Sequence, residues 1–194
     1  MTKHPYVKIN RRRRSSSTDY KARRKMIAGS SPLLAVRIST KNASVQFISP
    51  KVEGDHVLAS AHSRALRKLG WKGPLKSIPA CYLLGLLAGK TAKGKGVTEA
   101  HLYNGLSRFT NGSRVSALVK GVREAGVAVP MSDEALPPED KVSGKAIADY
   151  ASVLLKDDKE KYSRLFSGLL RSGFKPEEYT RHTTALKRAI TESR

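Results

Sequence analysis

Positive charge is concentrated in the first two thirds of this 194-residue chain, and this distribution constrains the fold more than any other feature. Residues 1–130 carry 25 basic and five acidic side chains, whereas residues 131–194 carry 12 basic and 11 acidic ones. Such an excess repels itself in a compact state unless an anion lies nearby. A chain of phosphates is a suitable anion, because each phosphate contact releases counterions. The first 130 residues are therefore expected to present a basic surface to a nucleic acid.

Other classes of partner and compartment fit the chain less well. The longest largely apolar stretch, residues 78–88, is shorter than the roughly 20 residues that span a bilayer. No stretch joins a basic face to a wide apolar face rich in Trp or Phe, so a membrane surface is a poorer partner than RNA or DNA. The chain begins Met-Thr-Lys-His-Pro with no apolar run behind it, which predicts no signal peptide. Cys81 is the only cysteine, which excludes a disulfide within the chain and fits a reducing cytosol.

The first 130 residues predict an α/β fold. A helix is expected over residues 19–27, capped by Ser17 or Thr18. Alternating apolar residues then predict an antiparallel hairpin with one wet face, followed by a third strand, over residues 34–38, 45–47 and 56–61. Further along, a helical turn, a buried helix, a strand, a helix capped by Ser113 and a last strand are expected at 63–70, 79–90, 97–105, 113–126 and 127–129. This alternation favours parallel pairing, so the predicted fold is a mixed sheet flanked by helices.

The remaining residues predict a different organisation. Residues 131–140 are rich in proline and are expected to form a linker, and helical segments follow at about 143–155, 158–171 and 176–191. We therefore divide the chain into residues 1–28, a basic RNA-binding arm with a short helix, residues 29–130, the α/β domain, and residues 131–194, a linker with a helical C-terminal extension.

Two basic segments are candidates for RNA contact. The run Arg11–Arg14 suits phosphate contact and stacking on bases, with a solvated tail or a localisation signal as the alternative. The segment Ser60–Gly73 gathers His62, an indole and four cationic side chains. Its Trp71 suits stacking on a base or ribose, but Trp71 alone is better explained as a core residue.

Other patterns in the sequence are weaker indicators of function. Residues 111–114 suit either a phosphate held on backbone amides at a helix start or an ordinary capped turn. The five histidines are scattered along the sequence and form no cluster with Cys or carboxylate residues, so no metal site is expected. Cys81 lies in an apolar helix, which favours an inert thiol over a nucleophile. The carboxylates of the first 130 residues are scattered, which argues against a magnesium-dependent ribonuclease; they are Asp19, Glu53, Asp55, Glu99 and Glu124.

Several segments together resemble the universal large-subunit ribosomal protein L-eighteen family, in its archaeal and eukaryotic form. They are Thr18-Asp19-Tyr20 with Arg23 and Arg24, the block Ser60–Gly73, Pro79–Gly89, Gly112–Val115 and Gly126–Pro130. The resemblance covers about residues 10–152, and the role of the chain beyond residue 152 stays open. It implies a structural protein without catalytic residues, cofactor or metal, on a mixed sheet akin to that of the small-subunit S-eleven family.

The resemblance also implies partners: 5S rRNA, the 23S-type rRNA of the large subunit and the L-five family of ribosomal proteins, in the central protuberance of cytoplasmic ribosomes. A non-specific nucleic-acid-binding protein is the alternative, since it needs the charge but not these segments. The residues expected to contact RNA are Arg11, Arg12, Arg13, Arg14, Thr18, Tyr20, Arg23, Arg24, Arg37, His62, Arg64, Arg67, Lys68, Trp71, Lys72, Lys93, Lys95 and Arg114.

Overall fold

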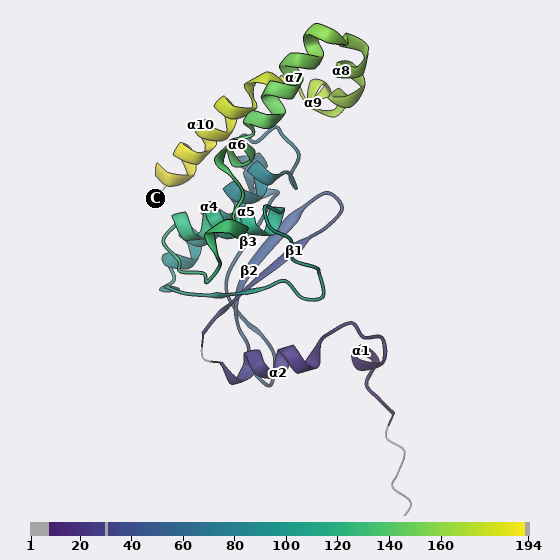
Figure 1. Ribbon diagram of the computed structural model, residues 1–194. Coiled ribbons are helices and arrows are strands. Elements are labelled where there is room, and N and C mark those ends of the chain that lie inside the picture. Colours follow the sequence, from purple (N-terminus) through teal and green to yellow (C-terminus); the bar gives the residue numbers. More distant parts are fainter. Residues whose placement is uncertain (1–7, 30, 193–194) are drawn as a thin grey trace, which may run out of the picture.

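The computed structural model describes residues 8–29 and 31–192 and is built around a four-stranded mixed sheet (Figure 1). The elements up to residue 124 are α1 (Arg11–Arg14), α2 (Tyr20–Ala28), β1 (Leu33–Ile38), β2 (Ala43–Ser49), β3 (His56–His62), α3 (Ala65–Lys68), α4 (Ile78–Lys93), β4 (His101–Tyr103) and α5 (Arg114–Glu124). Those that follow are the 3₁₀ turn η1 (Asp133–Ala135), α6 (Glu139–Ser143), α7 (Lys145–Asp157), α8 (Lys159–Leu165), α9 (Ser167–Arg171), η2 (Pro176–Glu178) and α10 (Tyr179–Glu192).

The sheet has the order β3-β2-β1-β4 and confirms the expected mixed α/β fold. β2 is antiparallel to both of its neighbours, and β4 is parallel to β1. Therefore β1, β3 and β4 run in one direction and end at the same edge of the sheet, here called the carboxyl edge. The helices that follow β3 and β4 run back from this edge, as any connection to the next parallel strand requires.

One face of the sheet packs against α4 and α5 to form the core. Leu34, Val45 and Phe47 are fully buried there, and α4 is buried almost all round. The two helices cross at small residues: a methyl group at Gly85 would overlap the carbonyl of Leu118 on α5, and one at Gly121 would overlap the carbonyl of Tyr82 on α4. Glycine is required at these two positions because the two backbones touch.

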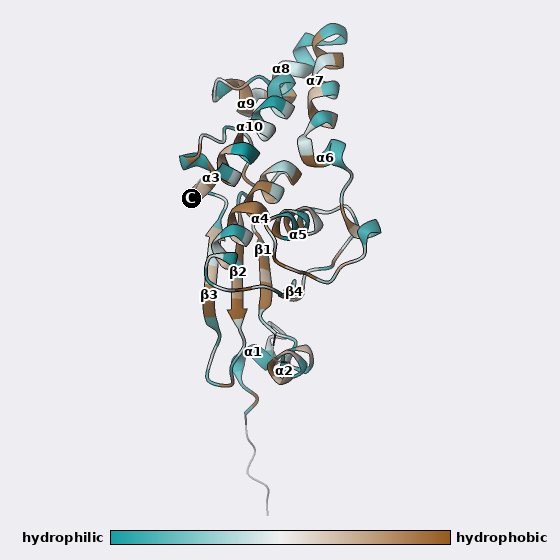
Figure 2. Ribbon diagram, turned by 90° about the vertical axis from the view of Figure 1, so that its left-hand side faces the viewer, coloured by the Kyte–Doolittle hydropathy of each residue, from teal (hydrophilic) through white to brown (hydrophobic). Residues whose placement is uncertain are grey.

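The other face is partly covered by α2, which corrects the expectation of a face that is wet throughout. Met26 of α2 packs against Leu33, Ala35 and Ile48, so this face is apolar at the end where α2 lies (Figures 1 and 2). The helix also begins differently from the prediction. Asp19, and not Ser17 or Thr18, caps it, because its Oδ1 accepts hydrogen bonds from the N–H groups of Lys21 and Ala22 at 2.9 and 3.0 Å.

Residues 131–140 are not a free linker but are fixed to α5. Arg123 donates from Nη1 to Oδ1 of Asp133 at 3.1 Å, and Lys120 donates from Nζ to Glu139 at 2.9 Å. Beyond them, α7, α8 and α9 extend past the carboxyl edge, and α10 returns along α4, where Leu186 and Ile190 join the core (Figure 1).

Candidate nucleic-acid interface

A row of polar side chains crosses the half of the sheet that α2 leaves uncovered. Arg37 on β1 pairs with Ser44 on β2, and Ser44 pairs with His62 on β3. Directly paired residues point to the same face of a sheet, and the next positions, Val36 and Val45, are buried in the core. The row therefore points away from α4. It brings together two predicted contacts, Arg37 and His62, and both are exposed.

Basic residues follow this row in the chain, where β3 ends and α3 begins. The N–H of Arg64 donates to Nδ1 of His62 at 3.1 Å, so Nε2 carries the proton of the neutral ring. Ser63 fixes α3 to the sheet, because its Oγ accepts a hydrogen bond from the N–H of Ala43 at 3.1 Å. The carboxyl-edge cluster is the name used here for the exposed residues Arg37, His62, Arg64 and Lys68. Arg67 is also exposed, but it lines a groove beside the C-terminal helices and is not part of this cluster.

A second basic group lies in α1 and α2, at the opposite edge of the sheet (Figure 1). Arg12 donates to Oγ1 of Thr18 from Nε and Nη2, at 3.1 and 2.9 Å. The guanidinium of Arg13 lies 5.4 Å from the ring centroid of Tyr20, within cation–π range. This group, here called the arm cluster, consists of Arg11, Arg12, Arg13, Arg14, Thr18, Tyr20 and Arg24.

Arg23 makes a structural contact that the sequence did not reveal. It forms an ion pair with Asp55 in the turn between β2 and β3, and its Nη1 donates to Oδ2 at 3.0 Å. The hydrogen bond to Asp55 raises the pKa of Arg23. A phosphate would therefore have to displace this carboxylate, and Arg23 serves first to hold α2 against the sheet.

Trp71 is a core residue, which corrects its inclusion among the RNA contacts. Only 1% of it is exposed, and its Nε1 donates to the carbonyl oxygen of Pro74 at 3.3 Å. His182 of α10 stacks on the indole with 5.1 Å between ring centroids, and Tyr179 meets it edge-on at 5.5 Å. The faces of the ring are therefore not free to stack on a base.

The other candidates are dispersed. The side chain of Lys72 is exposed, and its N–H donates to Nε2 of His182 at 3.1 Å. Lys95 donates from Nζ to the carbonyl oxygen of Leu58 at 2.9 Å, along the open edge of β3. Lys93 lies beside Gly126, and Arg114 is exposed at the first residue of α5.

The helix start at residues 111–114 differs in one detail from the prediction. Ser113 precedes α5, but its side chain makes no capping hydrogen bond, and its Oγ is buried without a partner. Phosphate binding by the amides of this turn stays a prediction.

A three-residue metal site and a reactive thiol are both missing from the part of the chain that the structure describes. There, no three His, Cys, Asp or Glu side chains lie close enough to hold a metal ion. Cys81 is fully buried, and this burial raises the pKa of its thiol to about 12, so the reactive thiolate is scarce near neutral pH. No helix among the same residues is long and apolar enough to cross a bilayer.

Comparison with known proteins adds what geometry alone does not give. Residues 5–102 match the family described as ribosomal large subunit proteins 60S L5 and 50S L18. The chain is 44% identical over 183 residues to the large ribosomal subunit protein uL18 of Thermofilum pendens, with 94% of this chain and 93% of that protein covered. It is 45% identical over 184 residues to uL18 of Aeropyrum pernix, with 94% and 86% covered.

Proposed function

Because this chain belongs to the uL18 family of large-subunit ribosomal proteins, we propose that it binds 5S rRNA and attaches it to the large-subunit rRNA in the central protuberance. Family membership makes it a ribosomal structural protein and not an enzyme. Beyond this family membership, the proposal specifies 5S rRNA as the RNA that the protein attaches, and a ribosomal protein of the L-five family as its neighbour.

The observation that carries the proposal is the carboxyl-edge cluster. Arg37 on β1 and His62 on β3 share one face of the open sheet at its carboxyl edge, and the exposed Arg64 and Lys68 follow directly after β3. The guanidinium groups suit phosphates, and His62 suits a ribose or base. A rigid sheet holds this pattern in place, and a fixed pattern of contacts distinguishes one folded RNA from another better than a flexible basic tail does.

The arm cluster has a different role in this proposal. Its residues are exposed apart from the half-buried Thr18, and α1 buries none of its side chains. Four consecutive arginines add phosphate contacts that depend little on sequence. We therefore assign affinity mainly to the arm cluster and discrimination mainly to the carboxyl-edge cluster.

A filter-binding titration with 5S rRNA, with transfer RNA as competitor across a salt series, tests this assignment. We expect preference for 5S rRNA to persist as salt rises. The double variant Arg37→Ala with Arg64→Ala should reduce that preference, at about 1–3 kcal/mol for the two contacts. Lys161→Ala with Arg171→Ala, in the near-neutral extension, is the matched control. Equal binding of both RNAs, lost together as salt rises, would favour the non-specific alternative.

A further inference from the structure

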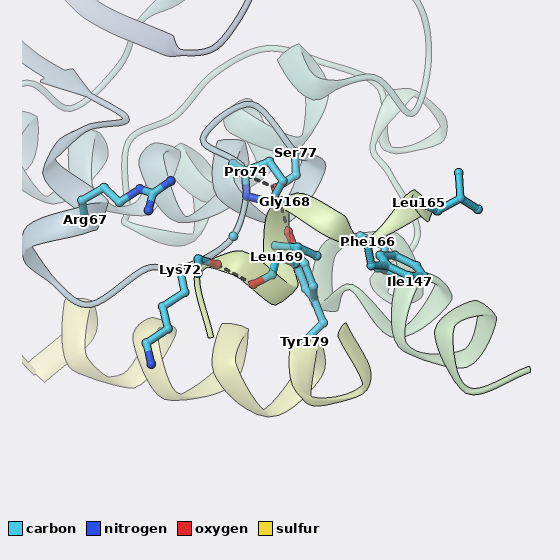
Figure 3. Close-up of a pocket in the computed structure, with 12 residues that line it drawn as sticks. Arg67, Lys72, Pro74, Ser77, Ile147, Leu165, Phe166, Gly168, Leu169 and Tyr179 are labelled. Carbon is cyan, nitrogen blue, oxygen red and sulfur yellow. Dashed lines mark hydrogen bonds between the residues drawn. The ribbon is translucent and has the colours of Figure 1, made fainter. Parts of the chain in front are cut away.

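A largely apolar groove lies between the loop that joins α3 to α4 and the C-terminal helices (Figure 3). Its volume is about 540 Å³, within the range of about 300–1,000 Å³ typical of ligand pockets. Pro74 comes from the loop, and Ile147, Phe166 and Leu169 come from α7 to α9. Leu165, at its margin, is 52% exposed, a large apolar surface for a monomer to leave in water.

The polar groups inside the groove are already paired. Oγ of Ser77 and the hydroxyl of Tyr179 share a hydrogen bond of 3.0 Å, and Oγ of Ser172 donates to the carbonyl oxygen of Leu169 at 2.7 Å. Reading the edge of a nucleobase requires hydrogen-bonding groups that are not already satisfied. The groove therefore suits an aliphatic or aromatic side chain better than a base.

The margin of the groove carries charge of one sign. Arg67 and Lys72 line it, whereas its lining, all of it within the described residues, includes no carboxylate. The backbone N–H of Lys72 donates to His182, which fixes the position from which the lysine side chain extends. A complementary occupant thus pairs an apolar group with a negative charge.

We propose that this groove docks a segment of a neighbouring protein of the large subunit in which an apolar side chain stands next to an Asp or Glu. The apolar side chain fills the space between Pro74 and Leu169, and the carboxylate meets Arg67 or Lys72. This inference uses the membership of the chain in the large subunit and does not depend on which rRNA it binds.

Site-directed photocrosslinking in assembled large subunits tests the proposal. Gly168 lines the groove, and a Cβ added there has no atom within 4 Å, so Gly168→Cys accepts a benzophenone label. The native Cys81 is fully buried and should not compete for the reagent. Ser163→Cys, on the exposed side of α8, is the control position. We expect a protein adduct from position 168 that maps by mass spectrometry to an apolar residue beside an acidic one, and none of that segment from position 163.

A second variant links the adduct to the chemistry of the groove. Leu165→Asp puts a carboxylate at the margin and should lower the yield from position 168 about fivefold, the size of an exposed charge effect. Leu170→Asp, on an exposed leucine that does not line the groove, should leave the yield unchanged. Adducts to RNA alone, no adduct, a basic partner segment, or equal effects of the two leucine variants would each overturn the proposal. Unchanged binding of 5S rRNA by these variants would separate this outcome from a failure of the proposed function.

Discussion

His182 connects the C-terminal extension to the loop that carries Lys72, and its protonation should weaken this connection. Burial lowers the pKa of His182, and the positive charge of Lys72 lowers it further, whereas Glu178 opposes them. The unfolded chain therefore takes up this proton first, at a pH near 6.5, while the folded chain resists it down to its lower pKa. Well above pH 6.5, His182 contributes no pH dependence to stability. Between that pH and its lower pKa in the folded chain, stability falls as the pH falls.

This pH dependence of stability should be visible in the melting temperature. The melting temperature of the wild type should drop more between pH 7.5 and pH 5 than that of His182→Gln, which offers an acceptor for the N–H of Lys72 but does not titrate. The other histidines are common to both proteins and cancel in the comparison. Parallel melting curves across this range would show that the hydrogen bond to Lys72 does not sense pH. Thermal unfolding followed by circular dichroism is sufficient for the measurement.

Single residues also show where sequence reasoning reached its limit. The run Arg11–Arg14 and the basic residues after β3 could be predicted as exposed cations, because a cluster of charge is visible in the sequence itself. Trp71 was expected in the core, but its partner His182 was not predictable, nor was the partner of Arg23, Asp55, because both partners lie far along the chain. No local pattern marks Tyr179 and His182 as the residues that cover the indole.

At the level of elements, the ion pair between Arg23 and Asp55 should hold α2 on the sheet. Arg23 is 17% and Asp55 35% exposed in their side chains, between a surface pair and a buried one. Removing the charge with Asp55→Asn should lower the free energy of opening α2 by about 1 kcal/mol. Hydrogen exchange of residues 20–28 should then become about fivefold faster. Glu53→Gln removes a charge from the same turn and should leave this exchange unaltered; equal acceleration would point to bulk electrostatics.

The contact between α4 and α5 offers a second test at this scale. A methyl group at Gly85 meets the carbonyl of Leu118, so Gly85→Ala must push two backbones apart and should destabilise the protein by about 1–3 kcal/mol or more. Gly168→Ala, in α9, meets open space and should be neutral or stabilising by up to about 1 kcal/mol through helix propensity. Urea unfolding of both variants checks this, and equal effects would refute the close approach.

Elements were predictable where their pattern was long and their ends were marked. Ser77 and Pro79 begin α4, and the hairpin of β1 and β2 follows its alternation. The lengths of the last two predicted strands, 97–105 and 127–129, were overestimated. β4 is reduced to His101–Tyr103, and residues 127–129 make only one bridge, between Ala128 and Glu99, because α5 and Pro130 leave them no length for a ladder.

For the molecule as a whole, the charge asymmetry predicts a division of roles along the sequence, but the structure shows no matching separation in space. The near-neutral extension does not stand apart from the basic part. Its α10 packs along α4, Lys187 pairs with Glu124 at 3.0 Å, and Tyr179 bonds to Ser77. The division into residues 1–28, 29–130 and 131–194 therefore stays a proposal about roles, since the core includes residues from both sides of position 131.

The salt dependence of RNA binding tests that division of roles. Each phosphate contact contributes about 0.7–0.9 to the slope of log affinity against log salt concentration, through the counterions that it releases. Replacing Arg11–Arg14 with alanine should therefore make the slope for 5S rRNA less steep by up to about 3. Alanine at Lys159, Lys161, Arg164 and Arg171 removes the same charge from the extension and should leave the slope nearly unchanged. If net charge alone set the affinity, both fourfold variants would shift the slope equally, and the location of the basic residues would carry no functional meaning.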